Sequence, residues 1–261
     1  MSVRSDQLNR LPAETFVRAV EWHEEIGSTN DRAIAAAVAM KQTLPLLVVA
    51  GRQTAGRGRG GNRWWGAPGA LMFSLALEGA ALKLSTDRWP QVSLATALVV
   101  GDVIRQLVPA ADVQLKWPND VYVAGRKACG ILLEAPAAAP GRIILGIGLN
   151  VNNSVSAAPP ELRDTAVALC DIAGKELDLF DALLGVLHGL EDDLSRLAAG
   201  HLNLTERWQP YCLLEGRTVT IQQGREEITG RCDSIDANGG LLLHTTSGQK
   251  SVISGTVVSY E

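Results

Sequence analysis

The spacing of apolar residues along the chain predicts a mixture of strands and helices. Residues 46–50 form a continuous apolar run, which is typical of a buried strand. Apolar residues alternate over residues 71–77 and indicate a second strand. Over residues 85–108 and 178–199 the apolar positions recur at helical spacing. Both of these segments are therefore predicted to be long helices that pack one face against a sheet.

Shorter elements fill the intervals between these segments. Residues 13–20 indicate a short helix, and the capping-box spacing of Ser28 and Asp31 predicts the start of an alanine-rich helix. Further strands are predicted over residues 112–117, 121–123, 127–134 and 142–151. The order lacks the regular strand–helix–strand alternation of a parallel sheet. We therefore expect an α+β domain over residues 1–213, with a mixed, mostly antiparallel sheet and flanking helices.

The pattern changes near residue 214. Short apolar stretches are then separated by turn residues, among them Asn238-Gly239-Gly240 and Ser254-Gly255. They fit five short strands of a small barrel or roll. We expect a second domain over residues 214–261, and nothing in it resembles a catalytic motif.

Composition narrows the class of protein. The chain has 261 residues, is 46% hydrophobic and carries a formal net charge of −4, as expected of an ordinary globular protein. It shows neither a signal-peptide pattern nor an apolar run of membrane-spanning length, so we expect a cytoplasmic protein without a membrane partner. The four cysteines form no CxxC pair, which predicts free thiols rather than a metal site. An acidic chain is also a poor general nucleic-acid binder.

Against this background, residues 51–64 (GRQTAGRGRGGNRW, the glycine-rich segment) concentrate positive charge. Glycine lets a ligand approach the backbone closely, and arginine offers paired donors to carboxylate and phosphate oxygens. The segment lacks the residue order of a P-loop and of a dinucleotide-binding loop. It is expected to bind a small anion. Composition alone leaves a second interpretation open, a Gly/Arg-rich RNA-binding module.

Residues 116–120, Lys-Trp-Pro-Asn-Asp (the lysine turn), are a second candidate. They place a cation, an indole and two oxygen-bearing side chains at the end of a predicted strand. A plain turn with a solvated lysine is the simpler interpretation of these residues alone. Glycines inside the strand at Gly146 and Gly148 mark the close approach of a ligand or of another part of the chain.

The two motifs together resemble the biotin protein ligase (biotin–[acetyl-CoA-carboxylase] ligase) family. The quoted residues are GRGRGGNRW at 56–64 and KWPND at 116–120, and Ser28-Thr29-Asn30, Gln53 and Gly148-Leu149-Asn150 stand in the same order. The resemblance extends from Ser28 to the C-terminus. It implies the class II synthetase-like fold of biotin and lipoate ligases, with an SH3-like β-barrel at the C-terminus.

The resemblance also implies an activity. In that family biotin and ATP give biotinyl-5′-AMP and pyrophosphate, and the biotinyl group then passes to one lysine of a biotin carboxyl carrier protein or domain. The implied cofactors are ATP, biotin and Mg²⁺, which would come with ATP rather than occupy a fixed protein site. A lipoate or octanoate protein ligase or transferase of the same fold is the alternative enzyme.

Site residues follow from the matched positions. Those implied to bind biotin are Ser28, Thr29, Asn30, Gln53, Arg57, Gly58, Arg59, Lys116, Gly146 and Gly148. Those implied to bind ATP or the adenylate are Arg59, Asn62, Arg63, Trp64, Lys116 and Asn150. Lys116, Arg59 and Arg57 are the implied catalytic cations. The sequence departs from the commonest bacterial pattern, GRGRRGR, at Gly60 and Asn62, so a phosphate contact from Asn62 stays open.

Members that double as repressors carry a DNA-binding domain before the catalytic domain. The 27 residues that precede Ser28 are too few for such a domain, so we expect a ligase without a DNA partner. The acceptor carboxylase and the formation of a homodimer both stay open.

Overall fold

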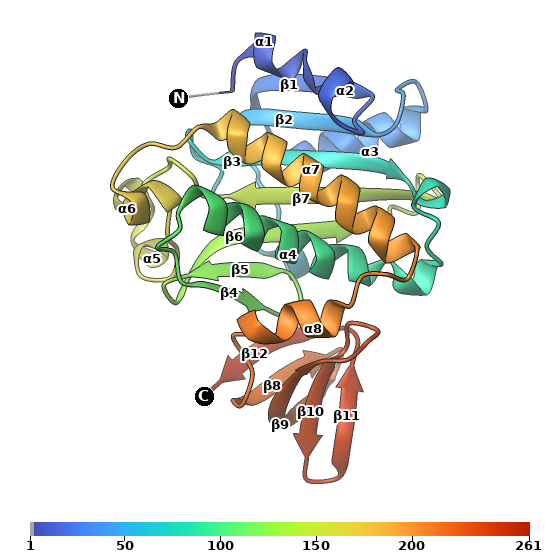
Figure 1. The fold of residues 1–261 in the computed structure, drawn as a ribbon, viewed down its shortest axis with the longest axis vertical. Coiled ribbons are helices and arrows are strands. Elements are labelled where there is room, and N and C mark those ends of the chain that lie inside the picture. Colours follow the sequence, from blue (N-terminus) through green and yellow to red (C-terminus); the bar gives the residue numbers. More distant parts are fainter. Residues whose placement is uncertain (1–2) are drawn as a thin grey trace.

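The computed structural model describes residues 3–261, and its larger part is built on a seven-stranded sheet of order β1-β2-β3-β7-β6-β5-β4 (Figure 1). The strands are β1 (Ala19–Ile26), β2 (Leu46–Gln53), β3 (Leu71–Glu78), β4 (Val113–Lys116), β5 (Asp120–Val123), β6 (Arg126–Glu134) and β7 (Arg142–Leu149). Strands β1 and β2 run parallel, and all the other neighbours in this sheet are antiparallel. The prediction of a mixed, mostly antiparallel sheet is confirmed.

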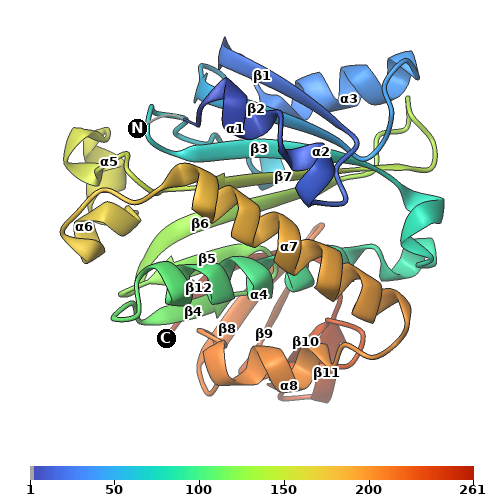
Figure 2. The ribbon, with the colours of Figure 1, turned by 45° about the horizontal axis from the view of Figure 1, so that its top comes forward.

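Helices cover both faces of this sheet. Helices α4 (Pro90–Leu107) and α7 (Leu179–Ala198) cross one face, and α3 (Thr29–Ala39) packs on the other (Figures 1 and 2). The remaining α-helices are α1 (Ser5–Leu8), α2 (Leu11–Glu14), α5 (Pro160–Arg163), α6 (Leu169–Ala173) and α8 (Leu204–Trp208). The 3-10 turns are η1 (Arg59–Gly61), η2 (Gly79–Leu82), η3 (Thr86–Arg88), η4 (Val155–Ala157) and η5 (Gln209–Tyr211). The two long helices predicted from apolar spacing are confirmed.

Helix α3 begins where the capping box predicts it. The Ser28 side chain accepts a hydrogen bond of 3.4 Å from the Asp31 backbone N–H, which satisfies one free donor of the first turn. Small buried residues, Ala33, Ala36 and Ala37, face the sheet and allow the helix to approach it closely. The first turn therefore lies against the sheet, with its polar side chains at the helix N-terminus.

The predicted helix over residues 13–20 is wrong. Helix α2 ends at Glu14, and strand β1 begins at Ala19. The sequence of β1, AVEWHEEI, does not indicate a strand. As an edge strand that is only partly buried, it carries charged residues and lacks a clear alternation of apolar and polar positions. Pairing with the apolar strand β2 determines its structure instead.

The C-terminal residues form a second sheet of order β11-β10-β9-β8-β12, as five antiparallel strands (Figure 1). They are β8 (Thr218–Gln223), β9 (Glu226–Ile235), β10 (Leu241–Thr245), β11 (Gly248–Val252) and β12 (Thr256–Tyr260). Trp117 lies at the junction of the two sheets, is 2% exposed, and donates an Nε1–H hydrogen bond of 3.0 Å to the Gly239 carbonyl. One continuous hydrophobic core contains Trp117 together with Val219 and Leu241.

The cysteines and the helix lengths relate to what composition predicted. The four cysteines are free, as expected. Within residues 3–261, no helix combines the length and the apolar character needed to cross a bilayer.

Candidate functional site

A cavity of about 390 Å³ lies among the glycine-rich segment, the first turn of α3, the lysine turn and strand β12. It brings together nearly all the predicted site residues, although they come from distant parts of the chain. Those that line it are Ser28, Thr29, Asn30, Gln53, Arg57, Gly58, Arg59, Asn62, Arg63, Trp64, Lys116, Gly146 and Gly148. The sequence motifs therefore meet in one place.

Asn150 is the predicted residue that does not line the cavity. It is 3% exposed, and its Oδ1 accepts a hydrogen bond of 2.9 Å from the Asn153 Nδ2. Its backbone N–H donates to the Ala128 carbonyl, and its carbonyl accepts from the Leu169 N–H. These contacts fix the end of β7, and an adenine contact from Asn150 stays a prediction.

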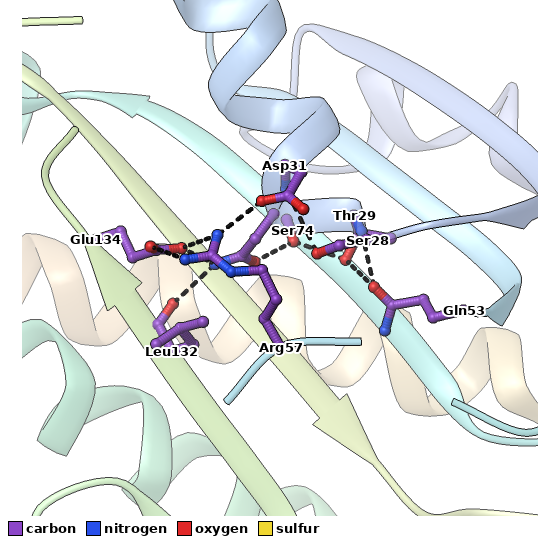
Figure 3. Close-up of polar contacts among 9 residues, drawn as sticks. Ser28, Thr29, Asp31, Gln53, Arg57, Ser74, Leu132 and Glu134 are labelled. Carbon is purple, nitrogen blue, oxygen red and sulfur yellow. Dashed lines mark hydrogen bonds and ion pairs between the residues drawn. The ribbon is translucent and has the colours of Figure 1, made fainter. Parts of the chain in front are cut away.

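One end of the cavity is a hydrogen-bonded polar cluster (Figure 3). The Thr29 backbone N–H and hydroxyl lie 2.7 and 3.1 Å from the Gln53 Oε1, to which both can donate. The Ser74 Oγ lies 2.8 Å from the Thr29 Oγ1 and 2.5 Å from the Asn30 Oδ1. Sequence reasoning missed Ser74, although a lone hydroxyl in the apolar run of β3 was its signal. The cluster holds Thr29, Asn30 and Gln53 in fixed positions.

Arg57 connects the glycine-rich segment to the body of the protein (Figure 3). Its Nη1 donates 2.7 Å to Asp31 Oδ1, and its Nη2 donates 2.6 Å to Glu134 Oε1. The hydrogen bond to Glu134 is the main reason that the pKa of Arg57 is raised. The guanidinium is thus already bound to two carboxylates. The predicted biotin contact of Arg57 therefore requires that a ligand carboxylate compete with these partners or add to them.

Glu134→Gln should loosen the glycine-rich segment. The amide keeps the shape of the side chain but removes the negative charge from a charge-assisted pair with Arg57. Because the Arg57 side chain is 39% exposed, solvent screens the pair, and we expect amide hydrogen exchange over residues 56–61 to quicken only about threefold. Hydrogen-exchange mass spectrometry measures this. Glu25→Gln, which breaks the exposed pair with Arg52, is the control, and equal exchange in both variants would contradict the role of Glu134.

The rest of the glycine-rich segment reaches toward the C-terminal sheet. The Arg59 Nη1 donates 2.6 Å to the Gly255 carbonyl, between β11 and β12, and burial lowers the pKa of Arg59. The Asn62 Nδ2 donates 2.8 Å to the Arg59 carbonyl, and the Arg63 Nη2 donates 3.3 Å to the Thr54 carbonyl. Asn62 is thus used within its own turn, and a phosphate contact from it stays a prediction.

Lys116 differs from the other cations that line the cavity. Its Nζ lies 4.7 Å from the centroid of the Tyr260 ring and 5.7 Å from that of Tyr122. Across residues 3–261 it makes no hydrogen bond or ion pair with an oxygen atom. Burial lowers its pKa, which the nearby Asp120 carboxylate partly offsets. By contrast, the Lys127 Nζ lies 2.6 Å from Asp120 Oδ1.

Two glycines of β7 make room for side chains of this chain. A Cβ at Gly146 would overlap the Asn30 Oδ1, and a Cβ at Gly148 would lie 2.5 Å from the Trp64 Cε2. The Trp64 indole also lies against Gly130, and its Nε1 is buried without a hydrogen-bond partner among the described residues. The expectation that the β7 glycines leave space for biotin stays a prediction. The structure shows that the side chains of Asn30 and Trp64 also require small residues at these two positions.

Sequence reasoning gave no role to several lining residues. Asp120, Lys127, Thr256 and Val257 all face the cavity. Asp120 belongs to the lysine turn, and Lys127 begins one of the predicted strands. The last two come from the C-terminal sheet, where no local pattern marks them, since only the packing of that sheet brings them to the site.

The chain is similar to proteins of one group in both sequence and structure. Residues 25–150 match the biotin/lipoate A/B protein ligase family, and residues 216–259 match the biotin protein ligase C terminal domain. A biotin–[acetyl-CoA-carboxylase] ligase of Mycobacterium tuberculosis is 32% identical over 256 residues, which cover 97% of this chain and 92% of that protein. The bifunctional ligase/repressor BirA of Bacillus subtilis is 31% identical over 95% of this chain and 76% of its own length.

Among solved structures, the biotin protein ligase of Aquifex aeolicus in complex with biotin and ATP superposes with a TM-score of 0.81. It is 30% identical in sequence, and the match covers 94% of this chain and 99% of that one. The likeness therefore extends across both sheets.

Proposed function

Because the chain belongs to the biotin/lipoate A/B protein ligase family, we propose that it is an ATP-dependent biotin protein ligase. The observation that carries the proposal is the cavity, where a fixed polar cluster at one end adjoins five cations. These cations are Arg57, Arg59, Arg63, Lys116 and Lys127. A reaction that joins two anions needs dense positive charge in a fixed position rather than a general base. Biotin carboxylate and ATP are two such anions.

In the proposed first step, a carboxylate oxygen of biotin forms a bond with the α-phosphorus of ATP. The bond from that phosphorus to the bridging oxygen of the β-phosphate breaks, and pyrophosphate leaves with the electron pair. Lys116 would stabilise the charge that develops on the α-phosphate oxygens, since its N–H donors are not bound to oxygen atoms within the described residues. Biotinyl-5′-AMP is the expected product.

In the second step, the neutral amine of one lysine on a biotin carboxyl carrier protein or domain attacks the acyl carbon. The bond from the acyl carbon to the AMP oxygen breaks, AMP leaves, and the lysine nitrogen loses a proton to solvent. The relatives named as acetyl-CoA-carboxylase ligases support an acceptor of this class. A biotin amide and AMP are the expected products.

Individual roles follow the cavity lining. We assign Ser28, which lines the cavity, and the polar cluster with Thr29, Asn30 and Gln53 to the ureido end of biotin, because the cluster holds amide and hydroxyl groups in fixed positions. The glycine-rich segment and the lysine turn would bind the carboxylate of biotin and the phosphates of ATP. Trp64 would pack against the adenylate.

Mg²⁺ is expected to enter with the ATP phosphates and to neutralise their charge. The carboxylate of Asp120 lines the cavity and is paired with the Lys127 ammonium. It would therefore have to bind the metal ion and Lys127 at the same time. Among the described residues, no group of three or more His, Cys, Asp or Glu is placed to hold a metal.

We also propose a division of roles along the chain. Residues 1–213 would form the catalytic domain that binds biotin and ATP, and residues 214–261 a C-terminal SH3-like domain. Thr256 lines the cavity, and Gly255 and Tyr260 contact the lining cations Arg59 and Lys116, which supports a second domain that completes the site.

The test of the function is ATP–pyrophosphate exchange that depends on biotin. The full chain should return radioactive pyrophosphate to ATP only when biotin and Mg²⁺ are present. Adding a biotin carrier domain should then give a biotinylated lysine, which mass spectrometry locates. Exchange that requires lipoate or octanoate instead would favour the alternative enzyme of the same fold, and no exchange with any of these acids would contradict a ligase.

A further inference from the structure

We propose that Tyr260, near the end of β12, is a positioning residue for the Lys116 ammonium in adenylate formation; the proposal rests on the function proposed above. The Lys116 Nζ lies 4.7 Å from the centroid of the Tyr260 ring and 5.7 Å from that of Tyr122. The negative face of an aromatic ring attracts an ammonium at such distances. Lys116 is therefore held by two rings, one from each sheet.

An aromatic ring leaves a lysine free to bind other groups, because it ties none of the ammonium's three N–H donors to an oxygen atom. Lys127, in the same cavity, is paired instead with Asp120 at 2.6 Å. Arg59 already donates to a carbonyl. Lys116 alone among the lining cations has only ring contacts within the described residues, so all its donors are available to carboxylate and phosphate oxygens. The rings fix its position without using those donors.

The Tyr260 ring is itself held in place. Tyr260 lies opposite Val219 in the pairing of β12 with β8, and Thr218 and Glu261 exchange two backbone hydrogen bonds of 3.1 and 3.0 Å just beyond it. The Arg217 guanidinium also lies over the same ring, 5.4 Å from its centroid. Without the ring, the flexible lysine stem could turn the ammonium toward solvent or toward Asp120. The C-terminal sheet would then contribute to the rate of adenylation through one side chain.

The test compares substitutions at Tyr260 in the full chain by biotin-dependent ATP–pyrophosphate exchange. Tyr260→Phe keeps the ring and should stay within about twofold of wild type, since the hydroxyl has no part in a cation–π contact. Tyr260→Leu keeps apolar bulk but removes the ring, and should slow exchange roughly fivefold to thirtyfold with little change in biotin affinity. Val258→Ala, an exposed position on the same strand, is the control and should match wild type.

A double-mutant comparison separates positioning from a general effect on the fold. In a Lys116→Ala background, Tyr260→Leu should lower exchange no further, because the ring acts through the ammonium. Equal losses in both backgrounds would assign Tyr260 a purely structural role and overturn the proposal. So would wild-type exchange by Tyr260→Leu. Thermal unfolding by circular dichroism confirms that each variant folds. A wild-type chain without biotin-dependent exchange would overturn the proposed function itself, whatever the variants do.

Discussion

Replacing Lys116 by alanine should slow biotin-dependent ATP–pyrophosphate exchange roughly 10²- to 10³-fold, the usual cost of losing one donor aimed at developing transition-state charge. Biotin affinity should change much less, since the polar cluster at the far end of the cavity is untouched. No neighbour can easily take over, because Arg57 and Lys127 are already paired with carboxylates.

Two further substitutions make the Lys116 result specific. Lys116→Arg should restore little activity, because a planar guanidinium fork is wider than an ammonium and does not fit between two rings in the same way. Lys250→Ala removes an exposed lysine on β11 and should leave exchange unchanged. An unaltered exchange rate in Lys116→Ala would return Lys116 to the simpler interpretation, a solvated lysine beside a turn.

Arg59→Gly should separate making the adenylate from retaining it. We propose that Arg59 binds the adenylate phosphate, and its Nη1 also joins the glycine-rich segment to the Gly255 carbonyl. Losing charge-assisted hydrogen bonds worth roughly 1.5–3 kcal/mol each corresponds to escape about ten- to a hundredfold faster, if the whole effect falls on dissociation. Lys116 and Arg57 remain, so biotinyl-5′-AMP should still form. The released anhydride would acylate exposed lysines of other proteins.

The measurement is to incubate the variant with ATP, biotin and albumin and to probe the albumin for biotin. Arg52→Gly is a suitable control, because Arg52 belongs to the same segment but pairs with Glu25 outside the cavity. Wild type and control should leave albumin unlabelled. If Arg59→Gly makes adenylate yet labels albumin no more than wild type does, Arg59 does not retain the intermediate.

Much of the fold was predictable because its apolar periods are long and regular. Helix α7 buries apolar positions at helical spacing, helix α4 is buried on all sides over residues 91–101, and strand β3 is a buried run whose polar members are Ser74 and the terminal Glu78. Strand β1 was not predictable, because its pairing with β2 outweighs the charge on its own residues. The local sequence pattern shows which residues are buried on one face, whereas the edge strand β1 depends on partners 27 residues away in sequence.

The residues of the candidate site also fall into those that the sequence predicted and those that it did not. Arg59 and Lys116 were found because each lies in a dense local motif of charge and turn residues, and the structure brings both to one cavity. Ser74 and Tyr260 were missed, because each is a single side chain in an ordinary strand. Ser74 contacts Asn30 and Thr29, which lie 44 and 45 positions earlier in the sequence. Tyr260 contacts Lys116, which is still farther away in sequence. Only the folded chain brings these residues together.

Trp117 lies inside a hydrophobic core that passes without a break from the seven-stranded to the five-stranded sheet. We therefore expect that the change of sequence pattern near residue 214 is not a boundary of folding cooperativity. Neither sheet can unfold without exposing apolar surface of the other, so the two should melt in a single transition. Any ligand that binds the cavity would then protect both sheets equally, by mass action on one shared native state.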